Sequence, residues 1–191
     1  MEKQRVVVGV TGASGQIYAK HIIEKLQTIG GVEIDIIFTD TAREVYKDET
    51  GEPLPSPLID NNRYYNRNAS GSNPAHALII IPCTMGTIGR IASGTSEDLI
   101  CRIADVQLKE RRKLIIVPRE TPYSLIHLRN MTLLTEAGTI IAPASPSFYT
   151  HPQSLNEMAD NFIARILDIA QISEMPADKR WLGESSSFLK P

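Results

Sequence analysis

The sequence is poor in cysteine and has no long apolar run, and each shortage excludes a class of protein. Its 191 residues include only Cys83 and Cys101, both in apolar surroundings and without the spacing of metal ligands. That usage is typical of reduced thiols inside a cell rather than of a disulfide scaffold. No apolar stretch approaches the roughly 20 residues that cross a bilayer, and the N-terminus lacks the pattern of a signal peptide. The sequence therefore predicts a cytoplasmic protein without a membrane span.

Neither sign of charge is in excess. The 20 basic and 22 acidic residues give a formal net charge of -2. This balance does not favour nucleic acid or an anionic membrane as a partner, so any anion site must be local. The chain, 42% hydrophobic, is long enough for one sizeable core and short for two enzyme domains. We expect one domain over residues 1–172, followed by a C-terminal tail at 173–191.

Short β-branched runs alternate with longer segments of helical periodicity. The runs lie at 6–8, 34–38, 78–81, 114–117 and 139–141. Helices are predicted at about 15–28, 41–48, 86–93, 97–109, 123–137 and 153–171. Continuous apolar runs of this length are typical of strands buried on both faces. The alternation predicts an α/β fold, a doubly wound parallel sheet with helices on both faces.

Two further segments have distinctive patterns. Residues 60–74 are polar and rich in turn formers, and we expect a long loop of the kind that is often functional. In the last predicted helix, a spacing of three and four places several apolar side chains on one face, and these are Leu155, Met158, Phe162, Ile166 and Ile169.

A glycine-rich turn follows the first predicted strand. The residues Gly9-Val10-Thr11-Gly12-Ala13-Ser14-Gly15 lead directly into a helix. Small residues and backbone N–H groups at a helix start suit an anion, so we expect a phosphate-bearing cofactor. The same pattern opens nicotinamide-dependent dehydrogenase domains, and Asp40 after the second strand would suit that ligand. The turn alone therefore leaves the cofactor open.

Four motifs in order narrow the choice. They are Thr11–Tyr18, Pro82–Thr87, Arg102–Arg112 with the adjoining Pro118–Pro122, and Pro143–Ser154. Together they resemble the flavin prenyltransferase (UbiX-type) family over roughly residues 5–172. The resemblance implies a flavodoxin-like (Rossmann-type) fold that binds reduced FMN as the prenyl acceptor. It also implies a homo-oligomer of trimers and dodecamers, in which the tail at 173–191 packs on a neighbouring subunit.

The resemblance also implies the residues of the site. FMN would contact Gly12, Ala13, Ser14, Thr39, Thr84, Met85, Gly86, Thr87 and Arg119. Dimethylallyl monophosphate, the prenyl donor, would contact Tyr64, Ser70, Arg102, Lys109, Arg119, Glu120, Tyr149 and Arg165. Relatives often carry tryptophan where this chain has Tyr64. They commonly carry a Ser-Lys pair where it has Thr39 and Asp40, so the hydroxyl is kept and the lysine is lost.

The family's reaction joins the dimethylallyl group to N5 and C6 of the flavin and releases phosphate without a metal ion. Because negative charge builds on the leaving phosphate, arginine and lysine side chains can take the place of magnesium. By resemblance, Glu120 and Tyr149 donate to the departing phosphate, while Ser14 and Glu49 manage proton removal at C6. The prenylated FMN would serve a separate UbiD-type decarboxylase.

Other functions remain as alternatives. An FMN-dependent decarboxylase of the same superfamily would use a histidine at a helix start and an Asn-bearing turn, whereas this chain has Pro143-Ala144-Ser145-Pro146. A non-catalytic flavin carrier would not need a phosphate-binding cluster. A nicotinamide dehydrogenase is the third alternative. The four histidines show no metal-ligand spacing, and Cys83 has no histidine near it in sequence that could activate it as a nucleophile.

Overall fold

The computed structural model describes residues 3–181 and 183. The chain forms two compact units, Met1–Ala144 and Ser145–Pro191. The first unit holds the strands β1 (Gln4–Val10), β2 (Val32–Phe38), β3 (Ile59–Asp60), β4 (Ala77–Cys83), β5 (Lys113–Pro118) and β6 (Ile140–Ile141). Its helices are α1 (Gln16–Thr28), α2 (Asp40–Thr50), the 3₁₀ helix η1 (Arg67–Ala69), α3 (Met85–Ala92), α4 (Leu99–Lys109) and α5 (Leu125–Glu136).

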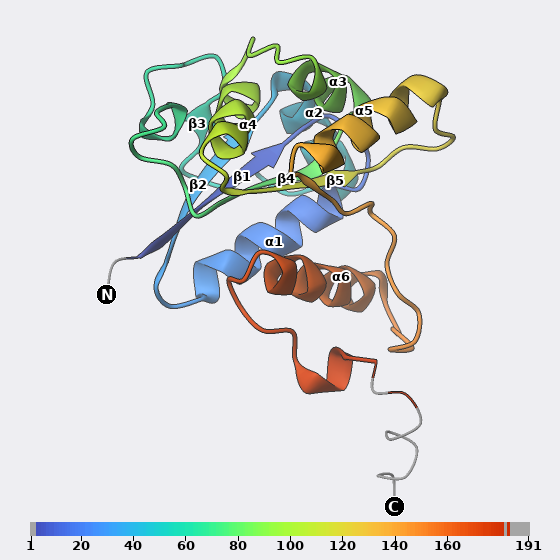
Figure 1. Ribbon diagram of the computed structural model, residues 1–191. Coiled ribbons are helices and arrows are strands. Elements are labelled where there is room, and N and C mark those ends of the chain that lie inside the picture. The colour runs from blue at the N-terminus through green and yellow to red at the C-terminus, as the bar shows by residue number, and fades with distance from the viewer. Residues whose placement is uncertain (1–2, 182, 184–191) are drawn as a thin grey trace, which may run out of the picture. The chain divides into compact units, whose positions relative to one another are not determined.

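The strands form a parallel sheet in the order β3-β2-β1-β4-β5-β6. Figure 1 shows α1 on one face of this sheet and α3, α4 and α5 on the other. The predicted doubly wound, flavodoxin-like α/β fold is confirmed. The chain winds outward in opposite directions from β1 and β4, so the order reverses between these two strands. Ligands of such sheets bind at this switch point, beyond the carboxyl ends of the strands.

Burial on both faces explains the continuous apolar runs in the sequence. Every residue of β4 is buried, and Val6, Val7 and Val8 of β1 have no exposed surface. Leu99, Ile100 and Ile103 of α4 pack in the same core cluster as β4. A sheet that is buried on both faces does not need alternating polar residues. This is why runs of apolar residues were enough to locate the strands in the sequence.

Polar caps define most of the helix starts. Thr39, Thr84, Asp98, Ser124 and Ser154 each accept a backbone hydrogen bond at the start of the next helix. A side-chain acceptor at this position satisfies an N–H group that the helix itself leaves unpaired. The predicted helices are therefore present, with ends that differ by a few residues. The short strand β3 was not predicted, because two residues carry no periodic signal.

The second unit contains α6 (Leu155–Ile169) and the 3₁₀ helix η2 (Ala177–Lys179). Phe162 and Ile166 of α6 are buried, whereas Leu155, which the spacing places on the same face, is 74% exposed. Leu155 is the first residue of the helix, and helical side chains tilt toward the N-terminus, which directs this one past the buried face. Part of the predicted tail at 173–191 lies outside the described residues.

Among the described residues, no helix combines the length and the apolar character needed to cross a membrane. His, Cys, Asp and Glu side chains in the same part of the chain form no group of three or more that could hold a metal ion.

Candidate functional site

Two turns meet at the switch point of the sheet. One follows β1 and contains Thr11 to Gly15, and the other follows β4 and contains Thr84. The hydroxyl of Thr11 donates to the carbonyl of Pro82 at 3.0 Å and accepts from the backbone N–H of Thr84 at 2.8 Å. Because one side chain bridges both turns, their relative position is set by direct hydrogen bonds.

The N-terminus of α1 already has an anion. The backbone N–H groups of Gly15 and Gln16 both donate to Oε2 of Glu49 at 2.8 Å. Gly15 can occupy this position because its φ of 98° lies in the left-handed region that glycine tolerates. Glu49 of α2 therefore takes these two donors. The glycine-rich turn in the sequence had suggested that a phosphate would take them. The 34-residue separation between Gly15 and Glu49 hid this contact from sequence reasoning.

The surroundings of Glu49 favour its ionised form. Burial raises the pKa of this carboxyl, but hydrogen bonds from the Ser14 hydroxyl and from two backbone N–H groups, together with the charge of Arg119, lower it below the usual 4.5. Arg119 follows β5, and its Nε donates to the carbonyl of Ser14 at 3.1 Å. Ser14, Glu49 and Arg119 therefore form one charged group at the edge of the site, with Glu49 a carboxylate at neutral pH.

Backbone donors on both turns fit a phosphate-bearing flavin. In the described part of the chain, no protein acceptor takes the N–H groups of Gly12, Ala13 and Ser14, or those of Met85 and Gly86 at the start of α3. A Cβ added at Gly86 would lie 3.9 Å from Nη1 of Arg90, an ordinary van der Waals distance, so this turn is open. Open donors in the turn before α1 and at the start of α3 are a favourable environment for an anion.

Gly12 packs too closely on α2 to carry a side chain. A Cβ at this position would lie 2.6 Å from Cγ2 and 2.9 Å from Cβ of Thr41. We expect Gly12→Ala to lower the free energy of unfolding by about 1–3 kcal/mol and to weaken FMN binding, because the turn must shift. Denaturant unfolding and an FMN titration measure both effects.

Two further variants test the cause of that loss. Adding Thr41→Gly removes both clashing atoms and should recover much of the stability and affinity. Gly30→Ala is the matched control, since an added Cβ there meets nothing within 4 Å. A Gly12→Ala protein as stable as Gly30→Ala, with unchanged FMN affinity, would contradict the prediction.

The other residues assigned to FMN lie at the same edge of the sheet. Thr39 follows β2, and its backbone N–H donates to the carbonyl of Val10 at 3.0 Å. The hydroxyls of Thr84 and Thr87 are 3.0 Å apart. Thr87 is buried and also accepts from Nη2 of Arg90 at 3.0 Å, so it supports Thr84. Sequence reasoning missed Arg90, whose only local signal is a cation one turn after Thr87.

Four of the residues assigned to the prenyl donor, Tyr64, Ser70, Arg102 and Lys109, lie in or beside segment 61–74. Tyr64 is 41% exposed, and its hydroxyl donates to the carbonyl of Ser96. The hydroxyls of Ser70 and Ser72 are 2.9 Å apart. The segment surrounds an open cavity of 440 Å³ that is lined by Tyr64, Tyr65, Asn66, Arg67, Ala69 and Ser70.

Helix α4 provides two of the expected cations beside this segment. Nε of Arg102 donates to the carbonyl of Ala69 at 3.2 Å, and Nη1 pairs with Asp105 at 2.6 Å. Lys109 pairs with Glu110. Arg102 and Lys109 share a face of α4, because seven residues are close to two helical turns. Both cations have carboxylate partners that an arriving phosphate would have to displace.

Arg119 and Glu120 remain apart from that group in the structure. Glu120 is exposed, and its Oε1 accepts from the backbone N–H of Thr121 at 3.0 Å. Across the described residues of the first unit, no hydrogen bond or ion pair joins Arg119 or Glu120 to Arg102 or Lys109. The structure thus brings together the FMN residues and leaves the phosphate residues in separate groups.

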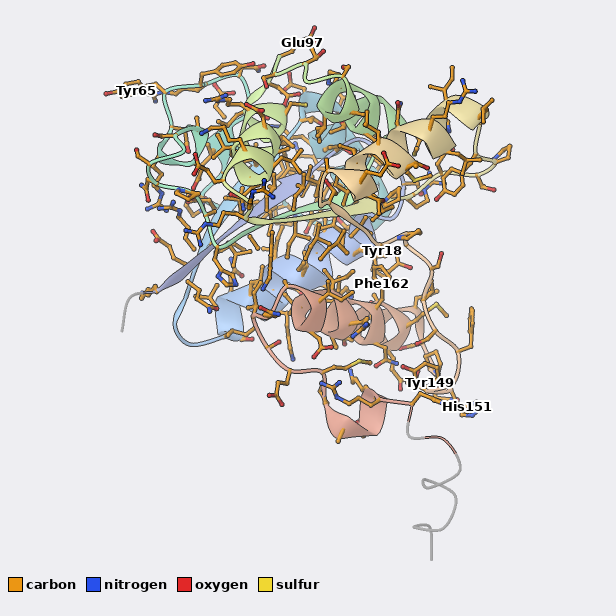
Figure 2. The ribbon with its side chains drawn as sticks, in the orientation of Figure 1. Tyr18, Tyr65, Glu97, Tyr149, His151 and Phe162 are labelled. Carbon is orange, nitrogen blue, oxygen red and sulfur yellow. The ribbon has the colours of Figure 1, made fainter. Side chains whose placement is uncertain are left out.

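The second unit contains Tyr149 and Arg165. The Tyr149 hydroxyl donates to the carbonyl of Lys179 at 3.1 Å, and its ring meets Trp181 edge-on at 5.6 Å (Figure 2 labels Tyr149). Arg165 pairs with Asp168 at 2.7 Å. A backbone hydrogen bond from Met175, with Arg180 and Arg165 beside it, lowers the pKa of Asp168. Within this unit, both assigned side chains already have partners.

The two cysteines are core residues. Both are free thiols and buried. Burial raises the pKa of Cys83 and raises that of Cys101 to about 11. A buried thiol that stays protonated at neutral pH is a poor nucleophile, which agrees with leaving Cys83 out of the catalytic residues.

Comparison with known proteins gives consistent matches along the chain. The model of the Flavoprotein family matches residues 1–179. Flavin prenyltransferase UbiX of Methanocaldococcus jannaschii is 39% identical over 183 residues, which cover 93% of this chain and 98% of that protein. Flavin prenyltransferase LpdB of Lactiplantibacillus plantarum is 41% identical and is covered over its full length, with 95% of this chain.

Solved structures agree with the sequence comparison. The crystal structure of AnUbiX (PadA1) in complex with FMN and dimethylallyl pyrophosphate has a TM-score of 0.89 and 37% identity, covering 95% of this chain and 99% of that one. A dodecameric FMN-dependent Ubix-like decarboxylase from Escherichia coli O157:H7 has the same TM-score at 34% identity, covering 94% and 100%. The peptidyl-cysteine decarboxylase EpiD, at 19% identity and a TM-score of 0.56, shares the fold alone.

Proposed function

This chain belongs to the flavin prenyltransferase family, within the Flavoprotein family, and we propose that it joins the dimethylallyl group of dimethylallyl monophosphate to N5 and C6 of reduced FMN. The observation that carries the proposal is the pair of open turns after β1 and β4. They are bridged by Thr11 and flanked by Glu49 and Arg119. Such an arrangement suits a flavin nucleotide that must be held still beside both a base and a cation.

Reduced FMN supplies the nucleophilic atoms, N5 and C6, to which the prenyl group is joined. The chain's part is to bind and orient it. The N–H groups of Gly12, Ala13 and Gly86 would hold it at the switch point, with the hydroxyls of Thr39 and Thr84 nearby. Arg119 would add a fixed positive charge, since its Nε is already oriented by the carbonyl of Ser14.

The cations would stabilise the leaving phosphate. When the allylic C–O bond breaks, its electron pair stays on the phosphate oxygen, and the added charge requires preorganised donors. Arg102, Lys109 and Arg165 each form an ion pair with a carboxylate in the structure, and each would turn to the phosphate of the donor. Glu120 and Tyr149 would donate hydrogen bonds or a proton to the departing phosphate.

Ser14 and Glu49 would accept the proton that C6 loses when the new carbon–carbon bond forms. The lowered pKa of Glu49 keeps it ionised and able to accept a proton at neutral pH. The Ser14 hydroxyl, which hydrogen-bonds to Glu49, can relay that proton. The base therefore lies on α2 and is held by the start of α1.

Assembly and context complete the proposal. Several apolar side chains of α5 are exposed, namely Leu125, Ile126, Leu128 and Leu133. An exposed apolar patch of this kind supports a homo-oligomer, which we propose to be built of trimers and to reach a dodecamer. We propose residues 1–172 as the FMN-binding domain, with 173–191 packing on a neighbouring subunit. The product would pass to a prenylated-FMN-dependent decarboxylase in the cytoplasm.

The direct test is anaerobic incubation with reduced FMN and dimethylallyl monophosphate, followed by mass spectrometry of the flavin. We expect a gain of one C5H8 unit. Glu120→Gln and Tyr149→Phe should lower the rate by about 10²–10⁴-fold, because each removes a proton donor for the leaving phosphate. Glu44→Gln and Tyr123→Phe change the same residue types elsewhere and should leave the rate unchanged. Tight FMN binding with unmodified flavin would instead favour a carrier or a flavin-dependent decarboxylase.

A further inference from the structure

A charged side chain lies within the parallel sheet. Asp35 is in the middle of β2 and is only 9% exposed. A carboxylate that loses water at such a position needs hydrogen-bond donors and an opposite charge. The residues that supply them come from segment 61–74, more than 30 positions further along the chain.

Arg67 and Asn68 hold this carboxylate from two sides. Nε and Nη2 of Arg67 donate to the two carboxylate oxygens of Asp35 at 3.2 and 2.9 Å. Nη2 also pairs with Glu33 at 2.7 Å, and Nδ2 of Asn68 donates to Asp35 at 2.7 Å. The hydrogen bonds with Asp35 and Glu33 raise the pKa of Arg67. We call these four residues, Glu33, Asp35, Arg67 and Asn68, the Arg67 clamp.

The clamp attaches the donor cavity to the sheet. Arg67 lines the 440 Å³ cavity together with Tyr64 and Ser70. It begins η1, and Ser70 directly follows that helix. Other attachments of the segment run to the region of α4, from Asn61 to Leu99 and Ile100, from Tyr64 to Ser96 and from Ala69 to Arg102, and one runs to β1, from Asn73 to Arg5. Of the hydrogen bonds described here, those of Arg67 and Asn68 are the ones that join the cavity to β2.

Elsewhere in the cavity wall, Tyr64 and Ala69 are each attached by a single hydrogen bond, to Ser96 and to Arg102. Tyr65 is 93% exposed and extends away from the fold in Figure 2. Short polar segments of this kind have many accessible conformations unless a specific contact restricts them. A buried ion pair is weak evidence for stability, since its desolvation offsets much of its attraction. We therefore expect the Arg67–Asp35 ion pair to affect the conformation of segment 61–74 more than the stability of the whole fold.

We propose that the Arg67 clamp is a positioning device for the prenyl donor. It fixes Tyr64 and Ser70 against β2 and thereby determines how tightly the chain binds dimethylallyl monophosphate. Arg67 acts through these two residues and has no part in bond making. This inference rests on the proposed function, and it adds residues that neither the motifs nor the family resemblance had indicated.

The test measures donor binding without turnover. Protein loaded with oxidised FMN is titrated with dimethylallyl monophosphate in a calorimeter, and the FMN affinity is measured separately. We expect Arg67→Met to raise the donor Kd by roughly 10–100-fold, because small displacements of positioning groups have effects of this size. FMN affinity should stay within about twofold, since the two open turns proposed to hold FMN follow β1 and β4, whereas the clamp is on β2. With reduced FMN, KM for the donor should rise more than kcat falls.

Matched variants separate positioning from a general loss of stability. Arg67→Lys keeps the charge and should recover part of the affinity, while Glu33→Gln should have a small effect because the three hydrogen bonds from Arg67 to Asp35 remain. Arg63→Met removes an exposed cation from the same segment and is the control. Asp35→Asn is the second variant if Arg67→Met does not fold.

Each outcome has a defined meaning. Normal donor affinity in a folded Arg67→Met or Asp35→Asn protein would overturn the clamp inference alone. Equal weakening of FMN and donor binding would also overturn it, because the effect would then be a general one. A wild-type chain that binds FMN but not the donor would overturn the proposed function, and the clamp inference with it.

Discussion

Glu49→Gln should remove most of the prenyl transfer, and we expect kcat to fall by about 10²–10⁴-fold. The carboxylate is the ionised group at the start of α1, bound by the N–H groups of Gly15 and Gln16 and by the Ser14 hydroxyl. Glutamine has a similar shape but cannot take a proton from C6. Single-turnover rates with reduced FMN measure the loss directly.

The control for Glu49→Gln is Asp48→Asn, which neutralises the neighbouring exposed carboxylate of α2. It should leave kcat unchanged. FMN affinity should be similar in both proteins, because the glutamine side chain can still accept a hydrogen bond from the turn. A Glu49→Gln protein with kcat within about threefold of wild type would remove Glu49 from the proposed mechanism.

The lowered pKa of Glu49 adds a pH signature with a definite sign. A carboxyl whose folded-state pKa is depressed contributes stability above its unfolded value, and that contribution is lost as the pH falls through the folded value. For Glu49 the contribution is complete above the usual 4.5 and disappears only below it. The stability difference between wild type and Glu49→Gln should therefore be constant at neutral pH and shrink in strong acid.

Arg119→Met is the second change with a large expected effect. We expect kcat to fall by about 10²–10³-fold, the usual result of removing one preorganised donor from a charged site. Arg119 contacts the Ser14 carbonyl and helps to keep the pKa of Glu49 low. Its loss should therefore also raise the pKa of Glu49, which an NMR titration of that carboxyl can follow.

Two further variants make the Arg119 test specific. Arg119→Lys keeps the charge without the planar donor geometry and should restore part of the rate and most of the pKa effect on Glu49. Arg129→Met removes an exposed arginine of α5 and should change neither. An unchanged Glu49 pKa in Arg119→Met would show that the two groups are not coupled as the contacts indicate.

Local signals accounted for the elements of the fold. The β-branched runs located β1, β2, β4 and β5, because strands buried on both faces are apolar throughout. Caps such as Thr39, Thr84 and Ser154 explain why the observed helices begin close to the predicted positions. The two-residue strand β3 and the exposure of Leu155 were not predictable, since neither depends on a repeating pattern.

The sequence by itself determined the α/β class and the family, because these depend on patterns within a few neighbouring residues or on whole motifs. Only the tertiary structure decided which groups meet. Glu49 reaches Gly15 across 34 positions, Thr11 meets Thr84 across 73, Arg119 meets Ser14 across 105, and Arg67 meets Asp35 across 32. The order of strands in a sheet sets such contacts, and strand order leaves no periodic signal in the chain.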